Sequence, residues 1–185
     1  MKHLGLAMIY NTKITKNSFK DFSDYLLSNK EDLALLEYLT KTDKDFNPKE
    51  FNLVPLDDWD HSGEHREYFN SFIQKIEQDY NVTCSLMVYY PAGSYIGWHT
   101  NSNFEFYNAI CTFSDTGDSF FEYVKNEDLI KVQDNVGWTV KKTKWGKEDS
   151  VLHRAVSNCN RITLTFSSKD EATITTLITD INSNI

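Results

Sequence analysis

The chain changes its hydrophobic pattern once, near residue 81. Before this point, apolar residues recur at three- and four-residue spacing in "SFKDFSDYLLSNKEDLALLEYLT" (residues 18–40) and in "SGEHREYFNSFIQKIEQDY" (residues 62–80). Such spacing predicts amphipathic helices that pack against a core. The first segment fits one helix or two helices broken near Ser28.

Capping and turn residues complete the prediction for the remaining helical and loop segments. Ser62, followed by Glu64, is a candidate N-terminal cap for the second helix. Residues 41–60 place two prolines among acidic and amide side chains, which predicts a loop. The tail "EATITTLITDINSNI" (residues 171–185) fits either a short closing helix or a strand, because its threonines have low helix propensity.

After residue 81 the pattern is typical of β-structure. Short runs rich in branched and aromatic residues are separated by turn-like pieces: "VTCSLMVYY", "YNAICTF", "SFFEYV", "LIKVQ", "GWTVKK" and "RITLTF". Strands of this length without intervening helices predict an antiparallel barrel or a double-sheet jelly roll. We therefore expect a mainly β protein with N-terminal helices. It would form a single domain over residues 1–185, with a helical layer mainly in 17–80 and a jelly-roll core at about 82–168.

Composition restricts the classes of partner and the compartment. The 185 residues include 19 basic and 27 acidic side chains, for a net charge of −8, which disfavours nucleic acid as a partner. Three cysteines without CxxC spacing suggest neither a disulfide framework nor a thiolate zinc site. We find no signal-like segment and no apolar run long enough to span a bilayer, so we expect a cytoplasmic protein that does not bind membranes.

Candidate metal ligands lie in "YYPAGSYIGWHTNSN" (residues 89–103) and in "SVLHRAVSNCNRITLTF" (residues 150–166). On an extended strand, His99 and Asn101 point to the same side and could both reach one metal ion, with His153 as a further donor. Two imidazoles and one oxygen donor on one face of a metal form the arrangement used by non-heme Fe(II) oxygenases. The alternative is that each histidine is an ordinary hydrogen-bonded residue.

Arginine is rare in this chain and one copy begins a predicted strand. Only Arg66, Arg154 and Arg161 occur. The period of two in "RITLTF" puts Arg161, Thr163 and Thr165 on one face. An inward guanidinium requires an anionic partner, and a dicarboxylate ligand would satisfy it. The alternative is a solvated polar face on which Arg161 pairs with a surface acid.

Taken together, these motifs resemble a known enzyme family. The succession Tyr90, Gly93, His99, Asn101, His153 and Arg161 is similar to the 2-oxoglutarate- and Fe(II)-dependent oxygenases, in the group of prolyl hydroxylases and nucleic-acid dealkylating dioxygenases. The resemblance covers roughly residues 86–166. It implies a double-stranded β-helix, in agreement with the strand pattern.

The resemblance also implies roles for individual residues. His99 and His153 would bind Fe(II), and Asn101 would occupy the position of the usual carboxylate. Arg161 and the Tyr90 hydroxyl would hold the distal carboxylate of 2-oxoglutarate, with Thr163 beside them on the same face; Tyr89 faces the opposite way and is the weaker choice. The implied reaction uses dioxygen and couples oxidative decarboxylation of 2-oxoglutarate to hydroxylation of an unknown substrate, with a small molecule or peptide favoured.

Asn101 departs from the family pattern, which has aspartate at this position. A neutral amide compensates the charge of a metal dication less than a carboxylate does. Three functions are therefore compatible with the sequence: an active hydroxylase, a 2-oxoglutarate-dependent halogenase in which an added halide binds the metal, and a catalytically inactive jelly-roll binding module.

Some further residues are weaker candidates. His61 and His65, four residues apart, could clamp a metal on a helix but more often mark a solvated helix start. Aromatic residues of the β region could line a substrate pocket or belong to the core: Trp98, Trp138, Phe120, Phe121 and Tyr123. Glu122, between two of them, has no assigned role.

Overall fold

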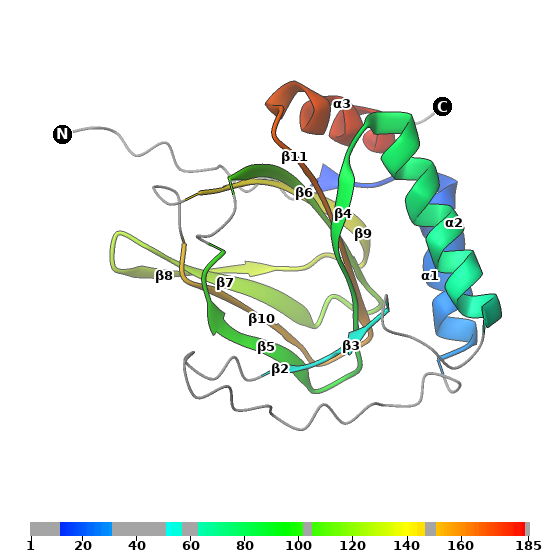
Figure 1. Ribbon diagram of the computed structural model, residues 1–185. Coiled ribbons are helices and arrows are strands. Elements are labelled where there is room, and N and C mark those ends of the chain that lie inside the picture. Colours follow the sequence, from blue (N-terminus) through cyan, green and yellow to red (C-terminus); the bar gives the residue numbers. More distant parts are fainter. Residues whose placement is uncertain (1–11, 31–50, 57–62, 102–104, 147–150, 184–185) are drawn as a thin grey trace.

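Two antiparallel sheets face each other in the structure, and helices cover one of them (Figure 1). The computed structural model of the protein describes residues 12–30, 51–56, 63–101, 105–146 and 151–183. Most consecutive strands of the chain belong to opposite sheets, as in a jelly roll; the exceptions are the β3–β4 and β7–β8 pairs. The mainly β, double-sheet jelly roll predicted from the sequence is confirmed.

The larger sheet has six strands in the spatial order β1-β9-β6-β11-β4-β3. In chain order these are β1 (Thr12–Lys13), β3 (Val54–Pro55), β4 (Thr83–Tyr90), β6 (Phe106–Ser114), β9 (Gly137–Trp145) and β11 (Arg161–Ser168). The smaller sheet has the order β2-β5-β10-β7-β8. Its strands are β2 (Phe51–Asn52), β5 (Ser94–His99), β7 (Ser119–Lys125), β8 (Asp128–Gln133) and β10 (His153–Ser157).

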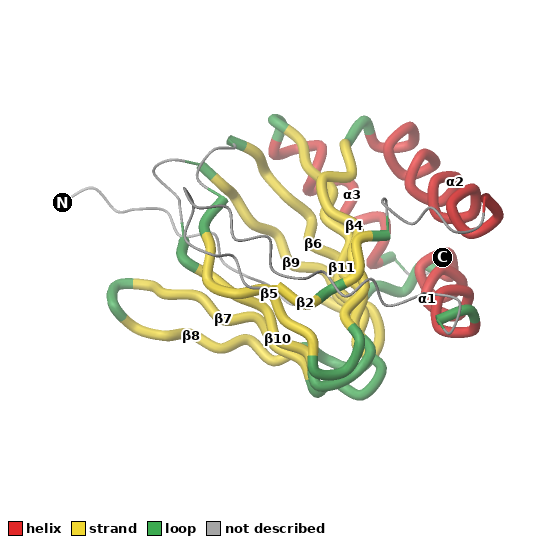
Figure 2. The backbone as a smooth tube through the Cα atoms, turned by 60° about the horizontal axis from the view of Figure 1, so that its bottom comes forward, coloured by secondary structure: helices red, strands yellow, loops and turns green. Residues whose placement is uncertain are grey.

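Four short connections cross between the sheets and lie together at one end of the two layers (Figure 2). They are residues 91–93, 115–118, 134–136 and 158–160. Gly93, Gly117 and Gly137 have positive φ angles of 80–86° in or beside these turns, a conformation that glycine adopts without a steric cost. We call this end the turn end; β11 begins there, at Arg161.

Three helices bury the outer face of the six-stranded sheet: α1 (Asn17–Ser28), α2 (Gly63–Tyr80) and α3 (Glu171–Asn182). In α1 the fully buried side chains Phe19, Phe22 and Leu26 follow the three- and four-residue spacing seen in the sequence. Each such side chain contributes on the order of 1.5–3 kcal/mol when it leaves water. Asp170 caps α3 by accepting hydrogen bonds from the backbone of Ala172 and Thr173. The tail is thus a helix rather than a strand.

β11 separates the apolar core from the space between the sheets. Ile162, Leu164 and Phe166 are fully buried in the core beneath the helices. Their neighbours with the opposite parity face the five-stranded sheet, as the alternation in "RITLTF" predicts. A polar row therefore lies inside the jelly roll.

In the N-terminal half, the loop predicted at residues 41–60 needs correction, and part of the predicted helical region lies outside the described residues. The predicted loop at residues 41–60 contains β2, which pairs with β5, and β3, which pairs with β4. Two-residue strands at a sheet edge are specified by the neighbouring strand rather than by local propensity, so the loop prediction was wrong there. α1 ends at Ser28, near the break that was considered. Residues 31–50 and the candidate cap Ser62 lie outside the described residues.

None of the described helices combines the length and the apolar character required to cross a membrane.

Candidate active site

A cavity of about 680 Å³ lies between the two sheets. Side chains from both sheets line it, including the polar row of β11. All six site residues assigned from the sequence are among the lining residues: Tyr90, His99, Asn101, His153, Arg161 and Thr163. The fold therefore brings together residues from four separate segments of the chain.

His99 and His153 face each other on neighbouring strands of the five-stranded sheet. They are directly opposed in the antiparallel ladder of β5 and β10. The centroids of their imidazole rings are 4.2 Å apart and the rings are inclined by 57°. Next to this pair the register of β5 and β10 shifts, between His153 and Ala155. Such a bulge re-aims side chains at a functional site.

Backbone carbonyls fix the tautomer of both imidazoles. His99 Nδ1 lies 2.8 Å from the carbonyl oxygen of Gly97, and His153 Nδ1 lies 2.8 Å from that of Val151. A carbonyl oxygen only accepts, so each Nδ1 carries the proton and each Nε2 is the basic nitrogen. This is the orientation that a metal-ligating histidine adopts when its second nitrogen donates to a backbone carbonyl.

Two aromatic rings pack against His153. The Trp145 ring stacks on the imidazole, with centroids 4.7 Å apart and planes inclined by 18°. Phe121 lies 5.3 Å away between centroids. His153 is only 4% exposed. These contacts limit the rotation of the imidazole and exclude water from one of its faces.

Asn101 follows the end of β5 and reaches the same place. Its Nδ2 atom donates to Nε2 of His153 over 3.4 Å. A half-turn of the amide exchanges Nδ2 for Oδ1, the atom that binds metals. Within the described residues no group of three or more His, Cys, Asp or Glu side chains could hold a metal ion. The described donors at this point are thus two imidazoles and one amide, without a carboxylate.

Arg161 is buried at the turn end of the cavity. It is 2% exposed. Its Nη1 atom donates to Thr163 Oγ1 over 2.7 Å, and its Nε atom donates to Asp134 Oδ2 over 2.9 Å. The partner acid of Arg161 is therefore a buried aspartate, not the surface acid considered as an alternative.

Tyr90 packs against the same guanidinium. The Arg161 carbon Cζ lies 4.8 Å from the centroid of the Tyr90 ring, a cation–π contact. Burial raises the pKa of Tyr90 above its ordinary value, and the charge of Arg161 opposes that rise. The phenol therefore keeps its proton at neutral pH and can donate a hydrogen bond. Tyr89 packs in the core beneath the helices, and its hydroxyl donates to Asn160 Oδ1 over 2.5 Å.

Two charged residues next to Arg161 were not identified from the sequence. Asp134, in the turn between β8 and β9, also accepts a 2.7 Å hydrogen bond from Lys141 Nζ. In "GWTVKKTKW" the lysine has the same parity as Thr139 and Thr143, which was the available signal that it points inward. Nothing local to Asp134 shows which residue it pairs with, because that depends on how the sheets pack.

The weaker candidates lie elsewhere. His65 Nδ1 hydrogen-bonds with the Tyr25 hydroxyl over 2.9 Å on the helical side, and His61 is outside the described residues. Trp138 donates through Nε1 to Ser23 Oγ in the core. Arg154 lies over the exposed Trp98 ring and bonds Glu122 through Nε over 2.6 Å. Among the candidate aromatic residues, Phe121 lines the cavity.

The comparisons with known proteins bear on the fold. No protein-family model matches the sequence, and no curated protein matches it. Among solved structures, a prolyl hydroxylase of Trichoplax adhaerens, in complex with a hypoxia inducible factor oxygen degradation domain peptide fragment, superposes with a TM-score of 0.50 and 12% identity. The match covers 91% of this chain and 86% of that one.

A prolyl-4-hydroxylase of Pseudomonas putida superposes with a TM-score of 0.47 and 10% identity, over 88% of this chain and 92% of that one. At these identities the likeness concerns the fold. The chain shares the jelly-roll architecture of the Trichoplax adhaerens enzyme.

Proposed function

We propose that this protein is a 2-oxoglutarate- and Fe(II)-dependent oxygenase. It would couple the oxidative decarboxylation of 2-oxoglutarate to hydroxylation of a substrate, within a single domain. One observation carries the proposal: an opposed pair of histidines and a buried arginine line the same cavity. The jelly-roll fold shared with a prolyl hydroxylase supports it at the level of architecture.

The donor set at the histidine pair fits a divalent transition metal. His99 and His153 each present a basic Nε2, and the Asn101 amide supplies an oxygen after a half-turn. Imidazole nitrogen and amide oxygen are ligands that iron accepts. When bound, Fe(II) would supply the redox chemistry that activates dioxygen. The two imidazoles and the amide would hold the metal, and the rest of the cavity would receive the 2-oxo acid.

Arg161, Thr163 and Tyr90 form the anion end of the same cavity. The guanidinium would pair with the distal carboxylate of 2-oxoglutarate, and the Tyr90 phenol would donate to the same group. Thr163 orients the guanidinium through its hydroxyl. Burial of all three side chains excludes water from the ion pair and so strengthens it.

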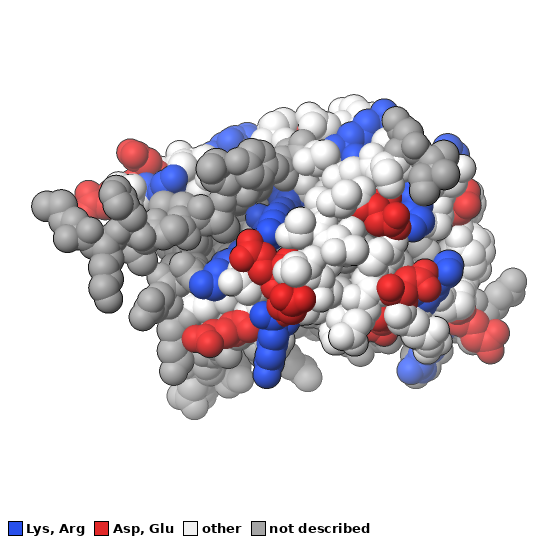
Figure 3. Space-filling view, turned by 90° about the horizontal axis from the view of Figure 1, so that it is seen from above, with Lys and Arg blue, Asp and Glu red and all other residues white. Residues whose placement is uncertain are grey.

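We propose a small molecule or a peptide as the substrate of this cavity. The structure of the Trichoplax adhaerens neighbour contains a peptide fragment, which supports this class of substrate. The net charge of −8 disfavours nucleic acid. On the face shown in Figure 3, the coloured basic and acidic side chains are interspersed.

An amide at position 101, where the family pattern has a carboxylate, favours a second candidate function, that of a halogenase. The described candidate ligands include no carboxylate, so an added anion would compensate the charge of the metal. A halide in that place would make the protein a halogenase. Retention of Arg161 and Tyr90 in the cavity argues against the third candidate, an inactive binding module, because such a module has no need of an anion end.

Binding measured without turnover tests the proposal. Mn(II), which takes the same ligands as Fe(II) without reacting with dioxygen here, should bind in a one-to-one ratio, and 2-oxoglutarate should bind more tightly in its presence. Titration calorimetry measures both. Absence of any Mn(II) binding, or 2-oxoglutarate affinity that is independent of the metal, would contradict the assignment of both ends to one site.

A further inference from the structure

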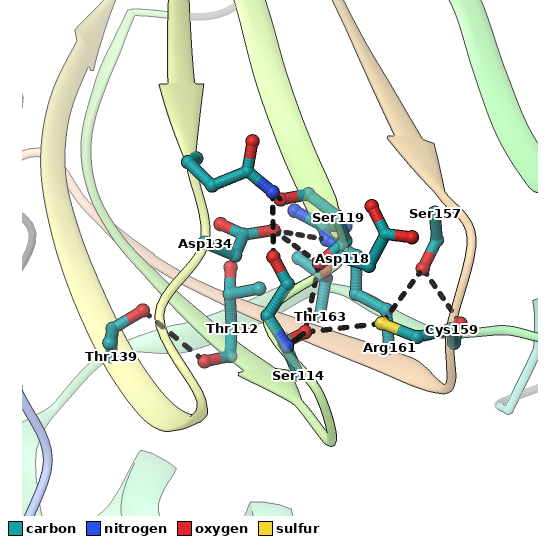
Figure 4. Close-up of polar contacts among 12 residues, drawn as sticks. Thr112, Ser114, Asp118, Ser119, Asp134, Thr139, Ser157, Cys159, Arg161 and Thr163 are labelled. Atoms are coloured by element: carbon teal, nitrogen blue, oxygen red, sulfur yellow. Dashed lines mark hydrogen bonds and ion pairs between the residues drawn. The ribbon is translucent and has the colours of Figure 1, made fainter.

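Three charged side chains, those of Asp134, Lys141 and Arg161, are buried together at the turn end of the cavity. Figure 4 shows Asp134 and Arg161 side by side there. Asp134 accepts hydrogen bonds from Arg161 Nε over 2.9 Å and from Lys141 Nζ over 2.7 Å. A third bond, of 2.9 Å, comes from Ser119 Oγ. The Asp134 side chain is 0% exposed, and those of Lys141 and Arg161 are each 3% exposed.

The charges in this cluster do not cancel. Lys141 and Arg161 are two cations, and Asp134 is one carboxylate. Burial raises the pKa of Asp134, but the charges of Arg161 and Lys141 outweigh burial and hold this pKa below its ordinary value. Burial lowers the pKa of Lys141, contact with Asp134 opposes that change, and the charge of Arg161 adds to it, so the pKa lies below its ordinary value. In the part of the chain that the structure describes, no second carboxylate bonds Lys141 or Arg161, so the cluster with a protonated Lys141 carries one positive charge in excess.

Only one of the three charged groups borders the cavity. Arg161 and its partner Thr163 are lining residues, whereas Lys141 and Asp134 lie behind them. Asp134 binds the Nε side of the guanidinium, and Nη1 is directed toward Thr163. A ligand therefore meets the excess charge of the cluster through Arg161 alone.

An Asp134–Arg161 pair without Lys141 would be neutral. A guanidinium that is already compensated by a buried carboxylate attracts a ligand carboxylate weakly, because the two anions repel each other across it. Lys141 binds the other oxygen of Asp134 and compensates that carboxylate. The guanidinium then keeps an unbalanced charge for a ligand, while Asp134 still fixes its orientation.

We propose that Lys141 is a positioning residue that acts through Asp134 and makes the Arg161 end of the cavity selective for a dicarboxylate. This inference rests on the proposed function, since 2-oxoglutarate is the dicarboxylate in question. Burial of an uncompensated charge costs free energy, so the empty site favours an anion that restores neutrality. Lys141 would set the affinity for the distal carboxylate without touching the ligand.

The test changes the net charge of the Asp134, Lys141 and Arg161 cluster and measures how tightly the protein binds carboxylate ligands. Lys141→Met makes the cluster neutral and should weaken binding of 2-oxoglutarate and of succinate by about tenfold or more, since a buried unit charge several ångströms away still interacts strongly. Lys144→Met is the matched control: Lys144 is an exposed residue of the same strand, and affinity should stay that of the wild type. Titration calorimetry with Mn(II)-loaded protein measures each affinity.

A rescue variant separates charge from packing. Asp134→Asn combined with Lys141→Met leaves Arg161 as the single charge, so the excess of one returns, and the asparagine oxygen still accepts from Nε. Dicarboxylate affinity should recover to within about threefold of the wild type. Binding of 2-oxobutyrate, a monocarboxylate of similar shape without the distal group, should be equal in wild type, single variant and double variant.

The outcomes separate this inference from the proposed function. If Lys141→Met folds poorly, Lys141→Gln removes the charge and keeps a donor to Asp134. The role of Lys141 is overturned if Lys141→Met or Lys141→Gln binds dicarboxylates as tightly as the wild type does. It is also overturned if these variants lose equal affinity for 2-oxobutyrate and for succinate. Failure of wild-type protein to bind either dicarboxylate overturns it too. Wild-type protein that binds succinate through this cluster but never converts 2-oxoglutarate would instead contradict the oxygenase function and leave the role of Lys141 standing.

Discussion

His99 lies directly opposite His153 across the antiparallel ladder of β5 and β10, with imidazole centroids 4.2 Å apart. The two residues are 54 positions apart in the sequence. Each donates from Nδ1 to the carbonyl of the residue two positions before it, so both basic Nε2 atoms are set by the same local geometry. The pair is therefore a preorganised set of two nitrogen donors.

Replacement of either histidine should abolish stoichiometric binding of Mn(II) or Fe(II). Each of His99→Ala and His153→Ala would remove one of the two imidazole donors of the proposed metal site. His65→Ala is the control, because His65 bonds Tyr25 on the helical side and should bind metal as the wild type does. Calorimetry gives the stoichiometry, and circular dichroism checks the fold. Tight one-to-one binding in both β-strand variants would place the metal elsewhere.

Arg161→Leu should weaken 2-oxoglutarate binding by roughly two orders of magnitude, since loss of a bidentate charge pair costs about 3 kcal/mol. Arg154→Leu is a matched control. This arginine belongs to β10, where its guanidinium lies over the Trp98 ring and bonds Glu122. Its loss should leave the affinity unchanged. Equal affinity in wild type and Arg161→Leu would refute the assignment of the anion end.

Asn101→Asp should tighten Fe(II) binding by about tenfold or more, because a carboxylate compensates the charge of the dication as the amide does not. Succinate release, measured with and without chloride, then separates the candidate functions. A hydroxylase turns over without chloride in both proteins. A halogenase requires chloride in the wild type and loses this requirement in Asn101→Asp. An inactive module releases no succinate in any condition. Weaker iron binding by the variant would show that Asn101 does not stand at a ligand position.

Asp134→Asn should destabilise the fold by about 3–5 kcal/mol, because it leaves Arg161 and Lys141 buried without a carboxylate. The pKa of Asp134 is lower in the folded chain than its ordinary value. Its contribution to the free energy of unfolding is therefore full above the unfolded pKa of about 3.9 and is lost as the pH falls through the folded value. Denaturant unfolding at pH 7 and pH 3 should show the difference between wild type and variant shrinking at the lower pH. A difference that is the same at both values would contradict the ionised pairing.

The sequence was sufficient to predict the β core and the face of β11. Period-two alternation in "RITLTF" depends only on the geometry of a strand, so the division between Ile162 and Arg161 could be predicted before the fold was known. His99 and Arg161, which were assigned from motif spacing, both line the cavity; their roles stay predictions.

The contacts that the sequence did not predict join residues that are far apart in the chain and depend on how the elements pack. The pairing of Asp134 with Arg161 joins a turn to a strand 27 positions away. β2 and β3 exist because β5 and β4 offer free edges. The partner of Trp138 is Ser23, which brings a helix against the sheet. No local pattern encodes these contacts.

The most direct test of the central claim is the visible charge-transfer absorption that forms when Fe(II) and 2-oxoglutarate bind the same site, recorded without dioxygen. Wild-type protein should develop this band on addition of both components and with neither alone. His99→Ala should not develop it, and Arg161→Leu should require roughly a hundredfold more 2-oxoglutarate. Absence of the band in wild-type protein at saturating Fe(II) and 2-oxoglutarate, or its persistence in His99→Ala, would contradict the account.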